Sequence, residues 1–262
     1  MTSPPLLTGV GVLVTRPEQQ AANLCRLLES HGAAAIRFPG MSICEHPARR
    51  TRLLQLAARP DFDVIIFISA NAVRFGAEFL AQRRDLAIAA VGPATARALN
   101  QAGYRVSIVA DEGFDSEHLL AHPRFAKLAG ARILVVKGSG GRNHLEQELT
   151  LRGAQVETAA VYERRAPFPA AASLSTLAER FEAGGIQLIT ATSLEIAMNL
   201  FALAHGGLRT YFENARWVAP SERVCAGIGA LGARRPVIRA NSAEDQELVD
   251  AILRWRSTES GA

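Results

Sequence analysis

The chain has 262 residues, of which 48% are hydrophobic, and its 29 basic and 25 acidic residues leave a net charge of +4. This hydrophobic content excludes a disordered chain, and the length suits one large domain or two domains of about 130 residues. The small charge does not favour nucleic acid as a partner, but it is compatible with an acidic small ligand. Three scattered cysteines and no signal-like N-terminal segment predict a cytoplasmic protein. No apolar run approaches the roughly 20 residues of a membrane helix, so no membrane partner is expected.

The expected elements alternate between strands and helices along the chain. Strands are expected at residues 10–15, 34–43, 64–68, 87–91, 106–109, 133–136, 156–162, 187–191, 216–219 and 237–239. Helices are expected at residues 18–30 and 46–60, after 69, after 93, at 116–122, around 145–149, up to 182, from 193, from 221 and at 243–255. Residues 166–172 are rich in proline and alanine and predict a linker, and the last six residues are expected to be disordered. The alternation predicts an α/β fold with parallel sheets.

The junction after residues 64–68 organises the rest of the chain. The apolar run ends at Ser69, Ala70 and Asn71, where a helix begins. A helix start offers free backbone N–H groups to a carboxylate or phosphate, but serine and asparagine are also ordinary helix caps. The same two interpretations apply at Pro93, Thr95, Thr192, Ser193 and Ser221.

The two halves of the chain resemble each other. Residues 10–34 align without gaps to residues 131–155, so Arg16 falls on Lys137. Further matches in the same order place Ser69 on Thr192 and Pro93 on Pro220. Four matches in one order predict an internal repeat of about 125 residues, and therefore two similar domains.

Two other features are candidates for chemistry. The loop from Lys137 through Gly138 to Arg142 combines glycines, which let backbone amides approach an anion, with two cations, and Arg16 holds the equivalent place in the first half. An ordinary turn with solvated cations is the alternative. Tyr162 ends a strand and is either a half-buried tyrosine at a strand edge or a proton donor to a leaving oxygen. No spacing favours metal ligation or a catalytic nucleophile, so no metal is expected.

Together these segments resemble the uroporphyrinogen-III synthase family. The resemblance rests on VLVTRPEQQA, DVIIFISANAV, AVGPATARAL, ILVVKGSGGR with VYERR, and LITATS, which span about residues 9–255 in the family's order. It implies two flavodoxin-like parallel-sheet domains, joined by a two-stranded linker, with the active cleft between them. Residues 1–38 and 168–262 would form domain one and residues 42–164 domain two, with segments 38–42 and 162–168 as the linker.

The resemblance also implies a reaction. Members of the family cyclise hydroxymethylbilane, a linear tetrapyrrole with eight carboxylates, invert its terminal ring and release water without a cofactor. Tyr162 would then be catalytic as the group that assists departure of the hydroxyl. The hydroxyl positions Ser69, Thr95, Thr192 and Ser221 would face the substrate. A monomer is expected, with transient contact to the preceding enzyme of the pathway.

Two sites depart from the family's pattern, and two other functions stay open. Leu194 and Glu195 replace the small polar residues of the first half, so the C-terminal half is expected to bind mainly through backbone amides. Glu222 stands where relatives carry a hydroxyl, and it would repel a carboxylate if it faced the substrate. A non-catalytic cytoplasmic sensor of a polyanion would need the same anion-binding helix starts. A flavodoxin-like electron carrier would need a phosphate loop rich in serine and threonine, which the loops after Arg16 and Lys137 do not supply.

Overall fold

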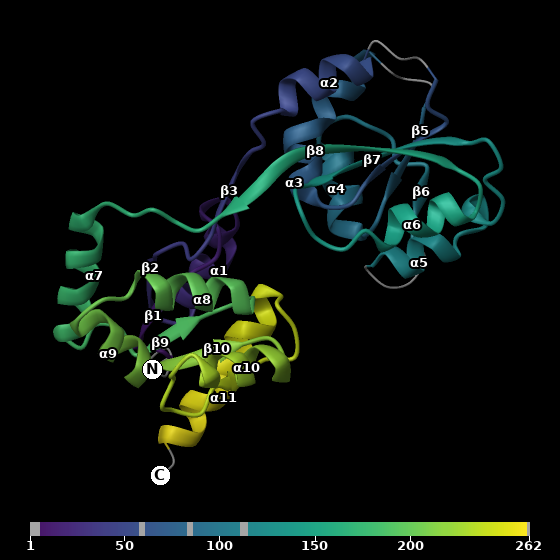
Figure 1. Cartoon of the computed structure of the whole chain (residues 1–262). Coiled ribbons are helices and arrows are strands. Elements are labelled where there is room, and N and C mark those ends of the chain that lie inside the picture. The colour runs from purple at the N-terminus through teal and green to yellow at the C-terminus, as the bar shows by residue number, and fades with distance from the viewer. Residues whose placement is uncertain (1–5, 58–60, 83–85, 111–114, 261–262) are drawn as a thin grey trace. The chain divides into compact units, whose positions relative to one another are not determined.

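The computed structural model describes residues 6–57, 61–82, 86–110 and 115–260. It divides into two compact units, residues 1–42 with 165–262 (unit 1) and residues 43–164 (unit 2). In Figure 1 the purple start and the yellow end of the chain therefore both belong to unit 1, whereas the middle of the chain forms unit 2.

Unit 1 holds a five-stranded sheet in the order β11-β10-β9-β1-β2. Its strands are β1 (Gly11–Val14), β2 (Ala34–Arg37), β9 (Leu188–Thr190), β10 (Arg216–Ala219) and β11 (Ile238–Arg239). Its helices are α1 (Glu18–Ser30), α7 (Ala171–Glu182), α8 (Leu194–Leu203), α9 (Gly207–Asn214), α10 (Glu222–Ala230) and α11 (Asp245–Ser260). Successive strand side chains point to opposite faces, so a strand covered on both faces is apolar throughout. Leu13 accordingly packs with α7, α8, α9 and α10, while Val12 packs with α1 and α11.

Unit 2 holds a six-stranded sheet in the order β3-β8-β7-β4-β5-β6. Its strands are β3 (Ser42–Glu45), β4 (Val64–Phe67), β5 (Ala87–Ala90), β6 (Ile108–Val109), β7 (Arg132–Gly138) and β8 (Gln155–Arg165). Its helices are α2 (Arg49–Ala57), α3 (Ala70–Gly76), α4 (Pro93–Gln101), α5 (Ser116–Ala121) and α6 (His144–Leu151), with 3₁₀ turns at Ala77–Gln82 and Pro123–Phe125. Helices α2, α3 and α4 cover the face that carries Ile65, and α5 and α6 cover the face that carries Ile66.

The predicted α/β fold with parallel sheets is confirmed. Strand β1 pairs in parallel with β2 and β9, and β7 pairs in parallel with β8 and β4. The order β2-β1-β9-β10-β11 of unit 1 is the flavodoxin-like order 2-1-3-4-5. The order β8-β7-β4-β5-β6 of unit 2 matches it strand for strand, with β3 added beside β8. The internal repeat therefore appears as two sheets with matching strand orders.

The register of the repeat differs from the sequence alignment in two places. Val12 and Ile133 are equivalent, and they pair with Leu188 and Val64 respectively. Val64 therefore matches Leu188, which places Ser69 on Ser193 and not on Thr192. By the same pairing Ala87 matches Arg216, so Pro93 falls on Glu222 and not on Pro220. Strands that are apolar on both faces match almost equally well after a shift of one or two residues, so the sequence alone does not determine the register of the repeat.

Several element boundaries also differ from the expectation. The segment expected as one strand at 34–43 is two strands, separated around Pro39 and Gly40, because proline has no N–H for the ladder. Helix α9 was not expected, and α7 begins inside the segment predicted as a linker. Helix α11 continues to Ser260, although the tail was expected to be disordered. The predicted end of the second helix at 58–60 lies outside the described residues. No described helix is both long and apolar enough to cross a membrane.

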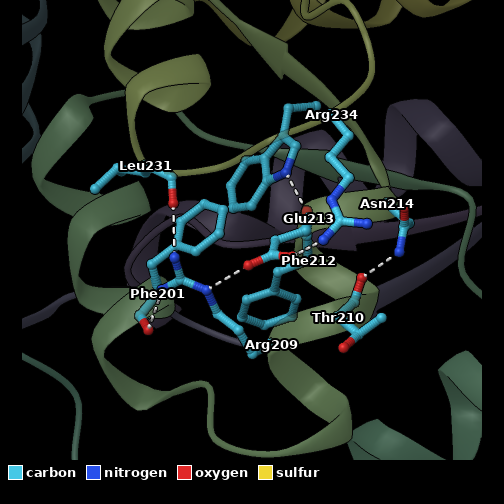
Figure 2. A network of polar contacts seen from close by, with 9 residues as sticks. Phe201, Arg209, Thr210, Phe212, Glu213, Asn214, Leu231 and Arg234 are labelled. Atoms are coloured by element: carbon cyan, nitrogen blue, oxygen red, sulfur yellow. Dashed lines mark hydrogen bonds and ion pairs between the residues drawn. The ribbon is translucent and has the colours of Figure 1, made fainter.

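A polar network in unit 1 joins α8, α9 and the loop after α10 (Figure 2). The Arg209 guanidinium lies 4.7 Å from the ring centroid of Phe201 and donates to the Leu231 carbonyl at 2.8 Å. It also donates to Glu213 at 2.9 Å, and Arg234 donates to the other carboxylate oxygen at 2.9 Å. The hydrogen bond from Arg209, helped by the charge of Arg234, holds the pKa of Glu213 below its ordinary value.

Two buried threonines connect β1 and β9 at their carboxyl ends. Thr15 and Thr190 are 1% and 0% exposed. The Thr190 hydroxyl donates to the Leu13 carbonyl at 3.2 Å, and the Thr15 hydroxyl donates to the Thr190 carbonyl. These bonds satisfy polar groups that would otherwise be buried without partners, and they tie together residues 175 positions apart.

Candidate functional site

The candidate residues of unit 2 gather at one edge of its sheet. Strands β4, β5 and β7 run in parallel, so their carboxyl ends meet at the same edge. Ser69 follows β4 and caps α3, where its Oγ accepts a hydrogen bond from the Ala72 N–H at 3.1 Å. Pro93 is the first residue of α4. The N–H that proline lacks would have no partner within the helix at this position, so its absence costs nothing. This edge therefore offers hydroxyl groups and helix starts from neighbouring strands.

A bulge in β8 determines the direction of Tyr162. Lys137 pairs with Ala160, whereas the next residue of β7, Gly138, pairs with Tyr162, so one residue of β8 is left over. Consecutive strand residues normally face opposite sides of a sheet. The extra residue instead places Tyr162 in the same apolar cluster as Val161. Bulges commonly redirect a side chain in this way near functional sites.

Three neighbours hold the Tyr162 ring. Its Oη lies 3.2 Å from Ser69 Oγ, and its ring stacks on Phe75 with centroids 6.1 Å apart. A Cβ added to Gly138 would lie 2.6 Å from Cζ of the ring, so only glycine leaves room for it. Tyr162 is 4% exposed, which is deeper than a half-buried tyrosine at a strand edge. The phenol is thus fixed in direction and hydrogen-bonded.

The glycine loop after β7 carries less free charge than expected. The Lys137 ammonium donates to Asn143 Oδ1 at 3.1 Å and forms an ion pair with Glu146, and the residue is 7% exposed. Arg142 is different, since its side chain is 81% exposed and its guanidinium lies 3.7 Å from the Glu117 carboxylate. Glu146 therefore offsets the charge of Lys137, whereas the guanidinium of Arg142 stays open to solvent beside Glu117.

Arg16 in unit 1 repeats the arrangement of Lys137. Its guanidinium forms an ion pair with Asp245 at 2.8 Å and donates to the Ala243 carbonyl, and its side chain is 14% exposed. Lys137 lies at the end of β7 and Arg16 lies just after β1, and each pairs with a carboxylate on a helix, Glu146 in α6 or Asp245 in α11. The sequence does not reveal these partners, because Glu146 is close to Lys137 along the chain whereas Asp245 is far from Arg16.

The other candidates of unit 1 lie at the starts of α8 and α10. Ser193 caps α8 by accepting a hydrogen bond from the Ile196 N–H at 3.3 Å, and Thr192 precedes it. Ser221 stands at the cap position of α10 without a side-chain cap bond. All three are partly exposed, so their side chains are accessible to a ligand of unit 1.

The remaining candidates are Thr95 in α4 and the two residues that begin α3. Thr95 lies in the first turn of α4 and is 4% exposed, as is Tyr162. Ala70 is exposed and Asn71 is partly exposed, both in the first turn of α3. The structure thus brings Ser69, Tyr162 and Gly138 together, whereas sequence reasoning missed Phe75.

Glu222 does not bring an unbalanced charge to the start of α10. Its carboxylate lies 3.5 Å from the Arg239 guanidinium, and its side chain is 80% exposed. Burial raises the pKa of the nearby Cys225 thiol, and the negative charge of Glu222 raises it further. This thiol is therefore held in its protonated, unreactive form. Among the described residues, no cluster of three His, Cys, Asp or Glu side chains is placed to hold a metal ion.

Comparisons of sequence and of structure match this chain to one protein family. The family model described as uroporphyrinogen-III synthase HemD matches residues 22–249. The chain is 28% identical to a uroporphyrinogen-III synthase of Escherichia coli and 29% identical to one of Salmonella typhimurium, over 93% of this chain and 100% of each relative. Solved structures of the uroporphyrinogen III synthases of Helicobacter pylori and Thermus thermophilus have the same fold. Their TM-scores are 0.64 and 0.56 at 14% and 19% identity, over 94% and 97% of this chain and 99% and 100% of theirs.

Proposed function

Because the chain belongs to the uroporphyrinogen-III synthase family, we infer that it is a cyclising lyase of tetrapyrrole biosynthesis. Its reaction converts the linear tetrapyrrole hydroxymethylbilane into uroporphyrinogen III, with inversion of the terminal ring and loss of water. The observation that carries this function is the family match across most of the chain. The same match favours an enzyme over a non-catalytic sensor of polyanions.

Helix starts are the proposed seats for the substrate's carboxylates. Helices α4, α8 and α10 begin at the carboxyl ends of their strands, where backbone N–H groups lack partners within the helix. Pro93, Thr192, Ser193 and Ser221 lie at these starts, and the hydroxyls of the last three add donors. Several fixed anion seats would fold a flexible tetrapyrrole so that its two ends meet. Holding reacting carbons in place in this way is a large source of rate enhancement.

The loops after the central strands would supply the remaining contacts. The exposed guanidinium of Arg142 and the amides of the glycine loop are suited to a carboxylate. Arg16 and Lys137 would act mainly by holding these loops against their helices, since both are already ion-paired. Ser69, Ala70 and Asn71 would contribute through the short helix start after β4.

Tyr162 is the proposed proton donor. As the hydroxyl leaves the terminal carbon of the substrate, the carbon–oxygen bond breaks and the oxygen needs a proton to depart as water. A phenol held at the carboxyl end of the sheet can provide it. We further propose a monomer in the reducing cytoplasm that meets the preceding enzyme transiently, which suits the unstable substrate and the three unpaired cysteines.

A coupled assay tests the function. Hydroxymethylbilane is generated in situ, the protein is added, and the oxidised porphyrin isomers are separated. Hydroxymethylbilane closes spontaneously to isomer I, so formation of isomer III in the presence of the protein establishes ring inversion. Isomer I alone, from folded protein, would refute the enzyme. Retention of the tetrapyrrole on the protein without turnover would then support the sensor.

A further inference from the structure

The environment of Tyr162 in unit 2 has no counterpart in unit 1. When the offset between the paired strands of the two units is continued along the sequence past β2, Met41 falls on Tyr162 and Pro17 on Gly138. The capping serine is kept as Ser69 and Ser193. Unit 1 thus builds the same sheet and the same capped helix around a buried, apolar Met41. The phenol and the glycine that makes room for it are therefore additions that this fold does not require.

The hydrogen bonds around Ser69 allow one arrangement in which Tyr162 can donate its own proton to the substrate. Ser69 Oγ already accepts the Ala72 N–H at 3.1 Å, so its own O–H is free to donate. Oη of Tyr162 lies 3.2 Å away, within hydrogen-bond distance. If Ser69 donates to Tyr162, the phenol's O–H is left to donate elsewhere. Hydrogen bonds in such a chain strengthen one another.

We propose that Ser69 is a positioning residue for Tyr162, because its hydroxyl donates to Oη and so directs the phenol's own proton toward the substrate's departing hydroxyl. This proposal rests on the function inferred above. It gives Ser69 a task beyond capping α3, and it explains why Gly138 and the bulge bring the ring to this serine.

The proton balance of the step closes without a further reagent. The carbon–oxygen bond of the substrate breaks, the Tyr162 proton moves to the leaving oxygen, and water departs. The resulting phenolate accepts the Ser69 O–H, which stabilises its charge. The proton that the pyrrole system loses when the ring closes then restores the phenol.

Raman spectroscopy tests the hydrogen bond without any substrate. The tyrosine doublet changes its intensity ratio according to whether the phenol accepts or donates a hydrogen bond. The wild-type spectrum minus that of Tyr162→Phe isolates Tyr162 from the other two tyrosines. The same difference is taken in the Ser69→Ala background. We expect the acceptor character of Tyr162 to fall when Ser69 is removed, and identical difference spectra would overturn the proposal.

A double-mutant cycle tests the positioning role in the reaction. We expect Ser69→Ala and Tyr162→Phe each to lower kcat by about 10- to 100-fold, at or below the lower end of a typical proton donor's contribution, with little change in KM. The double variant should be no slower than Tyr162→Phe alone, because Ser69 acts only through the phenol. Multiplied effects would overturn the proposal.

Ser69→Thr separates positioning from helix capping. Threonine keeps both the cap and a donating hydroxyl, whereas Ser69→Asp keeps the cap but has no proton to donate. We expect Thr to restore most of kcat and Asp to leave it low, with both variants folded by circular dichroism. Equal kcat values for the Ser69→Asp and Ser69→Thr variants would show that Ser69 serves only as a helix cap. A wild-type protein that makes no isomer III would refute the proposed function itself, while normal turnover with multiplied effects refutes only this inference.

Discussion

A single added methyl group at Gly138 tests how the site holds its phenol. In Gly138→Ala the new Cβ would lie 2.6 Å from Cζ, 2.7 Å from Cε2 and 3.0 Å from Oη of Tyr162. Carbon atoms in contact are about 3.5–4.0 Å apart, so the ring must move by about 1 Å. Such overpacking typically costs about 1–3 kcal/mol. A ring that moves this far also loses its 3.2 Å contact with Ser69.

Thermal unfolding and turnover measure the two effects of this substitution. Each kcal/mol lowers the unfolding midpoint by about 3–5 °C in a domain of the size of unit 2. Both tryptophans, Trp217 and Trp255, belong to unit 1, so their fluorescence follows that unit while circular dichroism follows both. We expect the loss in the circular dichroism transition of unit 2, together with a lower kcat.

Gly229→Ala is the matched control. Gly229 lies in α10, and an added Cβ would meet nothing within 4 Å. Alanine should therefore stabilise the helix by about 0.5–1 kcal/mol, the opposite sign from Gly138→Ala. If Gly138→Ala unfolds at the wild-type midpoint and turns over at the wild-type rate, the ring has room to spare and the packing argument is wrong.

Three further outcomes are expected. Lys137→Met leaves the Glu146 carboxylate, whose side chain is 14% exposed, without its ion-pair partner and should lower the free energy of unfolding in urea by about 1–3 kcal/mol. Adding Glu146→Leu should recover most of this loss. Wild-type turnover in the double variant would remove Lys137 from the substrate contacts. The lowered pKa of Glu213 means that its carboxylate stabilises the fold above its ordinary pKa and loses this effect as pH falls through the folded pKa. Wild type should therefore exceed Glu213→Gln in urea midpoint at neutral pH, and the two should converge as the pH falls through the lowered pKa of the Glu213 carboxyl. A gap that does not depend on pH would contradict the role of Arg209. Tyr162→Phe should lower kcat more than it raises KM, and unchanged rates would end its proposed role.

Local sequence signals predicted the frame of the fold. The apolar runs at residues 64–68 and 133–136, each followed within two residues by glycine or hydroxyl residues, indicated parallel strands that feed helices. The structure confirms this with β4 and β7. A helix cap was one of the two interpretations offered for Ser69, because serine is a preferred residue at a helix start, and the structure shows the capping hydrogen bond. Such features depend on residues close together in the chain, and a sequence displays them directly.

The contacts of the candidate site depend on pairing between distant segments. Ser69 and Tyr162 were each singled out, but their hydrogen bond follows from the register of β8 against β7 and from one extra residue in β8. Nothing in the composition of β8 marks that bulge. The partners of Arg16 and Lys137 were hidden for the same reason, because a charged side chain does not reveal which carboxylate it will meet.

The pairing of β1 with β9 has a consequence for synthesis of the protein. Residues 43–164 are continuous, so unit 2 has all its strands once they have left the ribosome. The first two strands of unit 1 must wait for Leu188, about 150 residues after β2 ends, which is about 8–30 s at ordinary translation rates. During this interval the apolar faces of Val12 and Leu13 have no sheet to join. A nascent chain stalled between these points should therefore be a preferred client of chaperones, and the middle of the chain should become protease-resistant before its beginning.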